Sequence, residues 1–212
     1  MTELTFNPLR DCLRDPIPEI GIAADMLNDA VSAHLQGQYQ RARELLVSSN
    51  LSAVRDWTDS LWGKNSQYAP QIKSSTAKAR NDAPRAVLRM PSASEKAALH
   101  ARDGYHCRFC GIPVIRAEVR RHLVILYQEL KLWGRRNPEQ HAALQCMWAQ
   151  YDHLVPHALC GDNTIENLLV TCAPCNYGRM DFTLEEAGLN NPFDREPVRD
   201  YWDGLERLLN KR

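Results

Sequence analysis

The 212-residue sequence lacks the features that would place it in a membrane or outside the cell. It has no apolar run near the ~20 residues of a membrane helix. Its N-terminus, Met-Thr-Glu-Leu-Thr-Phe, lacks the basic-then-apolar order of a signal peptide. Neither charge is in excess, with 26 basic and 26 acidic side chains. We expect a soluble, cytoplasmic protein in which the seven cysteines are thiols or metal ligands.

The zero net charge hides one basic stretch. Residues 64–90 hold six basic side chains against Asp82 alone. Such a stretch suits contact with phosphate groups, and it equally suits a solvated linker. Because it is rich in Gly, Ser, Pro and Ala and has no periodicity, we predict a basic linker over residues 63–92.

Residues 1–62 predict a small helical segment. Apolar residues recur at helical spacing over Glu19–Leu35, with Gly37 as a stop signal. Shorter helices are expected over Tyr39–Leu46 and Leu51–Leu61. Three short helices bury little by themselves. We therefore expect them to pack on the C-terminal part, on a second copy or on a protein partner.

Residues 93–212 predict the main domain. Ser92-Ala-Ser-Glu95 is a capping box for a helix ending near Asp103-Gly104. Within an insertion at about 116–147, an amphipathic helix is expected up to Trp133. Asn137-Pro138 then predicts the start of a second helix through about Cys146.

The remaining elements are short. Strands are expected over Trp148–Val155 and Leu168–Thr171, with a helix after Cys175. Thr183-Leu-Glu-Glu186 predicts a further cap, and Val198–Leu209 a final amphipathic helix. The predicted fold class is α+β and mostly helical.

Two Cys-x-x-Cys pairs are typical of a tetrahedral zinc site. The four ligands would be Cys107, Cys110, Cys172 and Cys175. Redox-active thiols are the alternative, although redox pairs usually occur singly. A site of four thiolates is closed to water, so we expect this zinc to be structural. Cys12, Cys146 and Cys160 are expected to be structural thiols.

The residues between Arg102 and Arg179 resemble the HNH endonucleases of the ββα-metal fold. The resemblance rests on five elements in order, namely Arg102-Asp-Gly-Tyr-x-Cys-x-x-Cys-Gly111, Asp152-His153-x-x-Pro156, Gly161, Glu166-Asn167-Leu168 and Cys172-x-x-Cys175-Asn176 with Arg179. It implies a C-terminal ββα-metal core with zinc knuckles, the inserted helical hairpin and phosphodiester hydrolysis.

Roles for individual residues follow from chemistry and from this resemblance. His153 suits the general base, because an imidazole accepts a proton near neutral pH. Asp152 supplies a hard oxygen for Mg²⁺ or Mn²⁺. The resemblance implies that Asn176 is the second protein ligand and that Asn167 braces the loop carrying His153. Arg179 and His157 are expected to contact a phosphate.

Each residue also has a structural interpretation. Asn176 could cap a helix, Arg179 could be solvated, and Asp152 and His153 could be a hydrogen-bonded pair. Cys160 stands where the family usually has glycine, so a positive φ there would strain the loop. Neighbours on a strand face opposite sides, so we expect a bulge at Asp152 and His153.

The sequence thus predicts a metal-dependent endonuclease for DNA, expected to be double-stranded. Its near-neutral charge argues against strong binding to DNA by itself, which suggests a partner, an oligomer or a recognition role for residues 1–62 or the insertion. Such gating suits restriction or phage defence. The alternatives are a non-catalytic, zinc-containing nucleic-acid-binding or scaffolding module and an RNA-cutting toxin.

Overall fold

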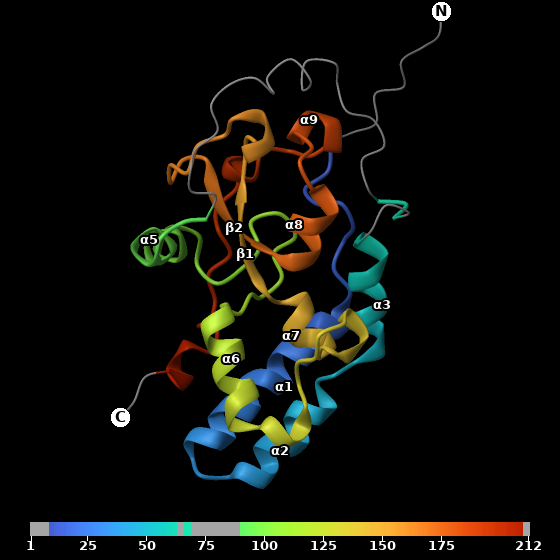
Figure 1. The fold of residues 1–212 in the computed structure, drawn as a ribbon, viewed down its shortest axis with the longest axis vertical. Helices are drawn as coiled ribbons and strands as arrows, with labels where there is room; N and C mark the ends of the chain where they lie inside the picture. Colours follow the sequence, from blue (N-terminus) through green and yellow to red (C-terminus); the bar gives the residue numbers. More distant parts are fainter. Residues whose placement is uncertain (1–8, 63–65, 69–89, 210–212) are drawn as a thin grey trace, which may run out of the picture.

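A computed structural model of the chain describes residues 9–62, 66–68 and 90–209 (Figure 1). All six basic residues of the predicted linker lie outside these ranges. The described fold is mostly helical with one two-stranded antiparallel sheet. Its α-helices and strands are α1 (Pro18–Leu35), α2 (Tyr39–Ser48), α3 (Ser52–Leu61), α5 (Ala93–Asp103), α6 (Ala117–Leu126), α7 (Ala142–Cys146), β1 (Ala149–His153), β2 (Leu168–Cys172), α8 (Ala173–Arg179) and α9 (Leu184–Ala187). Short 3-10 helices are η1 (Gln128–Leu130), η2 (Asn137–Glu139), η3 (His157–Leu159), η4 (Pro192–Asp194) and η5 (Glu206–Leu208).

The N-terminal helices form where the apolar spacing predicts them. Pro18 occupies the first turn of α1, where the missing N–H costs no hydrogen bond. The helix ends just before Gly37, whose φ of +77° suits glycine. α2 packs against α1, which buries a stripe of small and aliphatic side chains, namely Ile20, Ala23, Leu27, Ala30 and Val31.

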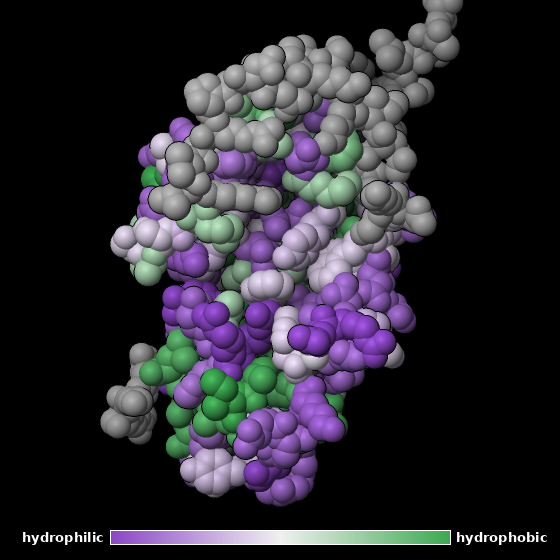
Figure 2. All heavy atoms as spheres, viewed as in Figure 1, coloured by the Kyte–Doolittle hydropathy of each residue, from purple (hydrophilic) through white to green (hydrophobic). Residues whose placement is uncertain are grey.

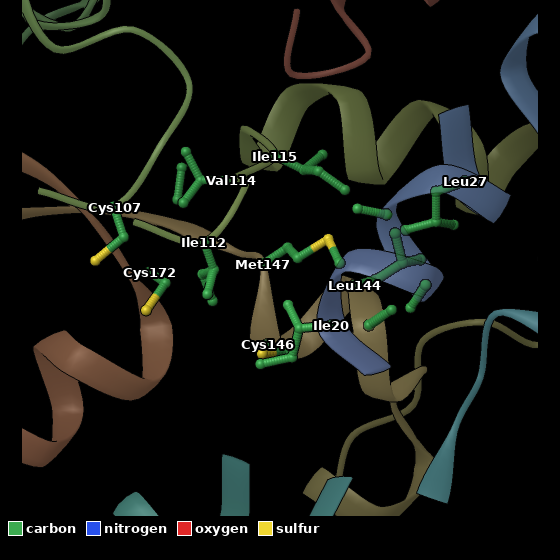
Figure 3. Packing of buried hydrophobic residues seen from close by; sticks show 14 of the residues in the cluster. Ile20, Leu27, Cys107, Ile112, Val114, Ile115, Leu144, Cys146, Met147 and Cys172 are labelled. Atoms are coloured by element: carbon green, nitrogen blue, oxygen red, sulfur yellow. The ribbon is translucent and has the colours of Figure 1, made fainter. Parts of the chain in front are cut away.

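One hydrophobic core joins this segment to the rest of the described chain. α3 packs on α7 and α8 and buries its own Trp57. Figure 3 shows Ile20 and Leu27 of α1 in the same cluster as Cys107 and Cys172. Of the three expectations for the N-terminal helices, packing on the C-terminal part is confirmed.

Helix α5 begins and ends as predicted. Ser92 and Glu95 form the reciprocal capping box, and Gly104 follows the helix with a φ of +73°. The last helical residue, Asp103, accepts a hydrogen bond at its Oδ2 from the backbone N–H of Val170, 3.0 Å away. This bond attaches α5 to the middle of β2.

The helices of the insertion are shorter than the periodicity predicts. α6 stops before Trp133, and the chain turns through η1. Asn137-Pro138 opens only the 3-10 turn η2. The helix α7 begins after His141, whose ring accepts from the backbone N–H of residue 144. A long-range contact accounts for the early stop: the Arg120 guanidinium lies 3.7 Å from the ring centroid of Trp133, which requires the chain to fold back on α6.

The sheet is a regular hairpin followed directly by a helix. The register is unbroken from Ala149 opposite Cys172 to His153 opposite Leu168, so the bulge that we expected is absent from this ladder. Cys172 ends β2 and is also the N-cap of α8, so the helix starts before Cys175 and not after it. Pro174 in its first turn favours this early start.

The predicted C-terminal helix over Val198–Leu209 is wrong. Only η5 is helical there, because tertiary contacts hold the chain in another path. Trp202 donates its indole N–H to the carbonyl oxygen of Val114 at 3.0 Å. Gly204 has a φ of +66°, and a Cβ at that position would lie 2.2 Å from the Tyr105 ring. The apolar residues of this stretch therefore recur at helical spacing because they are buried, although the chain is not an α-helix there.

The surface has both polar and apolar regions. No helix in the described ranges has both the length and the apolar composition needed to cross a bilayer. Figure 2 shows apolar surface over α6, where the Ile125 side chain is 71% exposed. A contact of the insertion with a partner or a second copy stays a prediction.

The packing of α3 on α8 can be tested at Gly178. A Cβ there would lie 2.9 Å from Leu13 Cδ1 and 3.0 Å from the Leu61 carbonyl oxygen. We expect Gly178→Ala to lower the free energy of unfolding by about 1–3 kcal/mol through overpacking. Urea denaturation measures this loss.

Gly21→Ala is the matched control. Gly21 lies in α1, and a Cβ there would meet nothing within 4 Å. Alanine should therefore raise stability by about 0.5–1 kcal/mol. Equal stability changes in the two variants would contradict the close contact between α3 and α8.

Candidate active site and metal centre

Four cysteines meet at one point, although the two pairs lie far apart in the sequence. Cys107 and Cys110 lie in the turn after α5, where Gly111 takes a φ of +76°. Cys172 and Cys175 lie at the junction of β2 and α8. The four Sγ atoms all lie within 4.8 Å of one another, and those of Cys110 and Cys172 are 3.6 Å apart.

This cluster has the geometry of a tetrahedral zinc site. Zn–S bonds of ~2.3 Å place the sulfur atoms roughly 3.8 Å apart, close to the 3.6 Å separation between Cys110 and Cys172. Burial raises the pKa of Cys172, so a bound cation is needed to stabilise its thiolate. The cluster can hold Zn²⁺ as a structural ion. In the described part of the chain, no other group of three or more His, Cys, Asp or Glu side chains converges in this way.

A pocket of about 730 Å³ lies next to this cluster. Its lining includes Asp152, His153, His157 and Asn176, which the sequence predicts as site residues, together with Tyr177. Four consecutive residues of β1 line it, because β1 has only one paired edge in the described sheet. Asn176 follows a cluster cysteine inside α8, so it is not the N-cap that we considered. The thiol cluster thereby sets the position of Asn176.

The Asp152 carboxylate is buried and held from two sides. Its Oδ2 accepts from Arg179 Nε at 3.0 Å and lies 2.8 Å from Arg179 Nη2. Its Oδ1 accepts from the backbone N–H of His153 at 2.8 Å. Burial raises the pKa of the Asp152 carboxyl, and the Arg179 guanidinium opposes this rise. Since a carboxylate has about four acceptor positions, Oδ1 keeps one for a cation.

Arg179 is 1% exposed, which differs from both sequence-based interpretations of this residue. Besides its bonds to Asp152, its Nη1 donates to the Phe182 carbonyl oxygen at 2.7 Å, and its Nη2 donates to the His153 carbonyl oxygen. The guanidinium has no surface left for the expected phosphate contact, and it is not solvated. Arg179 instead positions Asp152 and the end of β1.

The His153 ring lies in the pocket wall with 7% of the residue exposed. Its Nε2 is 2.7 Å from Asn163 Oδ1, and its centroid is 5.5 Å from that of His157. This contact holds the His153 ring in one orientation in the pocket wall. Asn163 is therefore a positioning residue for His153.

Asn167 closes the loop between the two strands. Its Oδ1 accepts from Val155 N at 2.8 Å, and its Nδ2 donates to the carbonyl oxygens of Val155 and Asp162 at 3.2 and 2.8 Å. Gly161 is required beside it, because a Cβ there would lie 1.8 Å from the Val155 carbonyl oxygen. Cys160 has a φ of +66°, a left-handed value that is costly for a residue with a Cβ.

Two residues at the site carry no signal in the sequence. Asn163 does not line the pocket and reaches His153 only through the folding of the loop, so no helix or strand pattern in the sequence joins the two. Tyr177 enters the pocket because α8 starts early, and a lone tyrosine in the sequence predicts nothing.

Comparisons of the chain with protein-family models, with curated proteins and with solved structures give no match. The interpretation of the site therefore depends on its geometry.

Removing one thiol tests the metal centre. We expect Cys172→Ser to lose zinc and not to fold, because a structural zinc contributes roughly 10–16 kcal/mol against a net domain stability of about 5–15 kcal/mol. Elemental analysis and thermal melting measure both effects. Cys160→Ser, outside the cluster, should keep the metal and the melting temperature. A wild-type protein that purifies without metal and still melts cooperatively would argue against this centre.

The ion pair between Arg179 and Asp152 gives a second test. Arg179→Met leaves a buried carboxylate without its partner, which should cost about 3–5 kcal/mol of stability. Arg41→Met removes an arginine from an exposed pair with Glu44 and should change stability by less than about 0.5 kcal/mol. Chemical denaturation compares them. Similar small losses in both would show that Arg179 is more solvated than the structure indicates.

Proposed function

We propose that the protein is a metal-dependent endonuclease of the HNH type that hydrolyses phosphodiester bonds in DNA. Two features support this proposal. The β1–β2 hairpin runs directly into α8, which is the order of a ββα-metal core. The residues of the motif, Asp152, His153 and Asn176, line one pocket beside a four-cysteine cluster. The shared pocket carries the proposal.

His153 is the proposed general base. Hydrolysis requires a group that removes a proton from water as it attacks phosphorus. Its Nε2 lies 2.7 Å from Asn163 Oδ1, a contact that holds the imidazole in one orientation in the pocket wall. Asn163 acts as a positioning residue, because it orients the base without a chemical role of its own.

Asp152 and Asn176 are the proposed ligands of a divalent cation. Their carboxylate and amide oxygens suit Mg²⁺ or Mn²⁺, and Asp152 Oδ1 keeps an acceptor position for it. When bound, the cation would stabilise the negative charge that develops on the phosphate. Arg179 holds the Asp152 carboxylate in one orientation, and Asn167 keeps the loop that contains Asn163 closed.

The proposed contacts with the rest of the substrate involve His157 and the basic stretch at residues 64–90. His157 lines the same pocket, which supports the phosphate contact that we propose for it. The basic stretch at residues 64–90, which would add phosphate contacts, lies outside the described residues. A role in restriction or phage defence, with residues 1–62 or the insertion contacting a partner, belongs to this proposal.

A plasmid-cleavage assay with added Mg²⁺ or Mn²⁺ tests the function. We expect the wild type to nick or cut the plasmid and His153→Ala to be slower by roughly 10²–10⁴-fold, the usual contribution of a general base. Asn163→Ala should fall between them, because the base remains but loses the contact that orients its ring. His122→Ala is the matched control, since His122 lies on α6 away from the pocket lining, and it should cut like the wild type.

The remaining outcomes identify the alternatives. Equal cutting by the wild type and His153→Ala would rule out the proposed base. Binding of DNA without cleavage under either cation would indicate a non-catalytic module. Preferential digestion of a structured RNA in the same assay would indicate the RNA-cutting alternative.

A further inference from the structure

A group of aromatic rings adjoins the proposed active site. Tyr177 lines the pocket and is 43% exposed. Its ring centroid lies 5.4 Å from that of Trp62 and 6.4 Å from that of Trp148. Trp133 extends the group, 6.0 Å from Trp148. All three tryptophans are partly exposed.

The group is assembled from distant parts of the chain. Trp62 follows α3, Trp133 belongs to the insertion, Trp148 immediately precedes β1, and Tyr177 lies on α8. None of these four residues is needed to bind the proposed cation. A purely structural aromatic core would be buried throughout, whereas Tyr177 presents its ring at the edge of the pocket.

A positive charge lies behind the rings. The Arg120 guanidinium is 3.7 Å from the Trp133 centroid and 4.2 Å from the Trp148 centroid. Burial lowers the pKa of Arg120 to about 10, so it remains charged at neutral pH. Among the described residues, its buried Nη1 has no hydrogen-bond partner. Stacking on two indoles thus takes the place of a directly bonded acidic partner within the described part of the chain.

These features match one kind of ligand. Aromatic side chains that stack on successive bases, together with positive charge that attracts the phosphates, are how proteins bind single-stranded nucleic acid. A duplex hides the faces of its bases and offers this surface only its outer edges. The rings lie next to the pocket, so a stacked base would bring its own phosphate close to His153.

We propose that Tyr177 and the adjacent tryptophans bind an unpaired nucleobase, so that the preferred substrate is single-stranded DNA or an unpaired stretch within a duplex. This inference rests on the proposed function for its cleavage step, and it replaces the double-stranded substrate expected from the sequence. Tyr177 is the contact residue, and Arg120 positions the tryptophans.

Binding can be measured separately from cleavage. A fluorescein-labelled single strand is titrated with protein in buffer without added Mg²⁺ or Mn²⁺, and anisotropy gives the affinity. We expect Tyr177→Ala to bind about tenfold more weakly, the usual effect of losing one stacked base. Tyr177→Phe, which keeps the ring, should bind like the wild type. Tyr39→Ala removes a tyrosine on α2 that is 54% exposed, more than Tyr177, and should have no effect.

The same titration with the duplex form separates the two kinds of substrate. We expect the duplex to bind more weakly than the single strand and to respond little to Tyr177→Ala. Thermal melting confirms that each variant is folded. Equal affinity of Tyr177→Ala and the wild type for the single strand would overturn the inference, as would tighter binding of the duplex. Plasmid cleavage by the wild type with unchanged binding by Tyr177→Ala would leave the proposed function standing and remove only this one.

Discussion

The convergence of four thiols is the constraint on which the rest of the site depends. It ties the turn after α5 to the junction of β2 and α8, two places separated by the whole insertion. Asn176 follows one of these cysteines directly, and β1 pairs with the strand that carries another. A metal at this point would therefore determine where every pocket residue lies. The closed sulfur cluster itself offers no position for water, so the hydrolysis that we propose would have to take place in the neighbouring pocket.

The pocket is held by charge and by hydrogen bonds more than by apolar packing. The buried Arg179 guanidinium engages the Asp152 carboxylate and two carbonyl oxygens, which holds the end of β1 against α8. Asn167 closes the loop above it, and Asn163 orients the His153 ring. Groups fixed in this way need little rearrangement when a charged substrate enters. The strained φ of Cys160 shows that the loop path is imposed by its surroundings.

The N-terminal helices and the insertion take part in this arrangement. α3 packs on α8, and Gly178 allows the two to approach closely. Trp62 from the end of α3 and Trp133 from the insertion both reach the ring group beside Tyr177. The surface next to the pocket is thus built from both ends of the chain, which gives a partner bound to either region a physical path to the site.

The sequence alone determined the parts that depend on local patterns: the N-terminal helices, the Ser92 capping box, the two cysteine pairs and the choice of Asp152, His153 and Asn176, which line one pocket. The sequence-based predictions failed where contacts between distant residues override helical periodicity. Examples are α6, which is shorter than predicted, the irregular chain around Trp202, and Arg179, which is buried. Only the tertiary structure decided that Asn163 meets His153 and that Trp62, Trp133, Trp148 and Tyr177 form one surface. The physical reason is that the spacing of apolar residues along the sequence shows which face of a helix or strand is buried. Which other element covers that face depends on packing across the whole molecule.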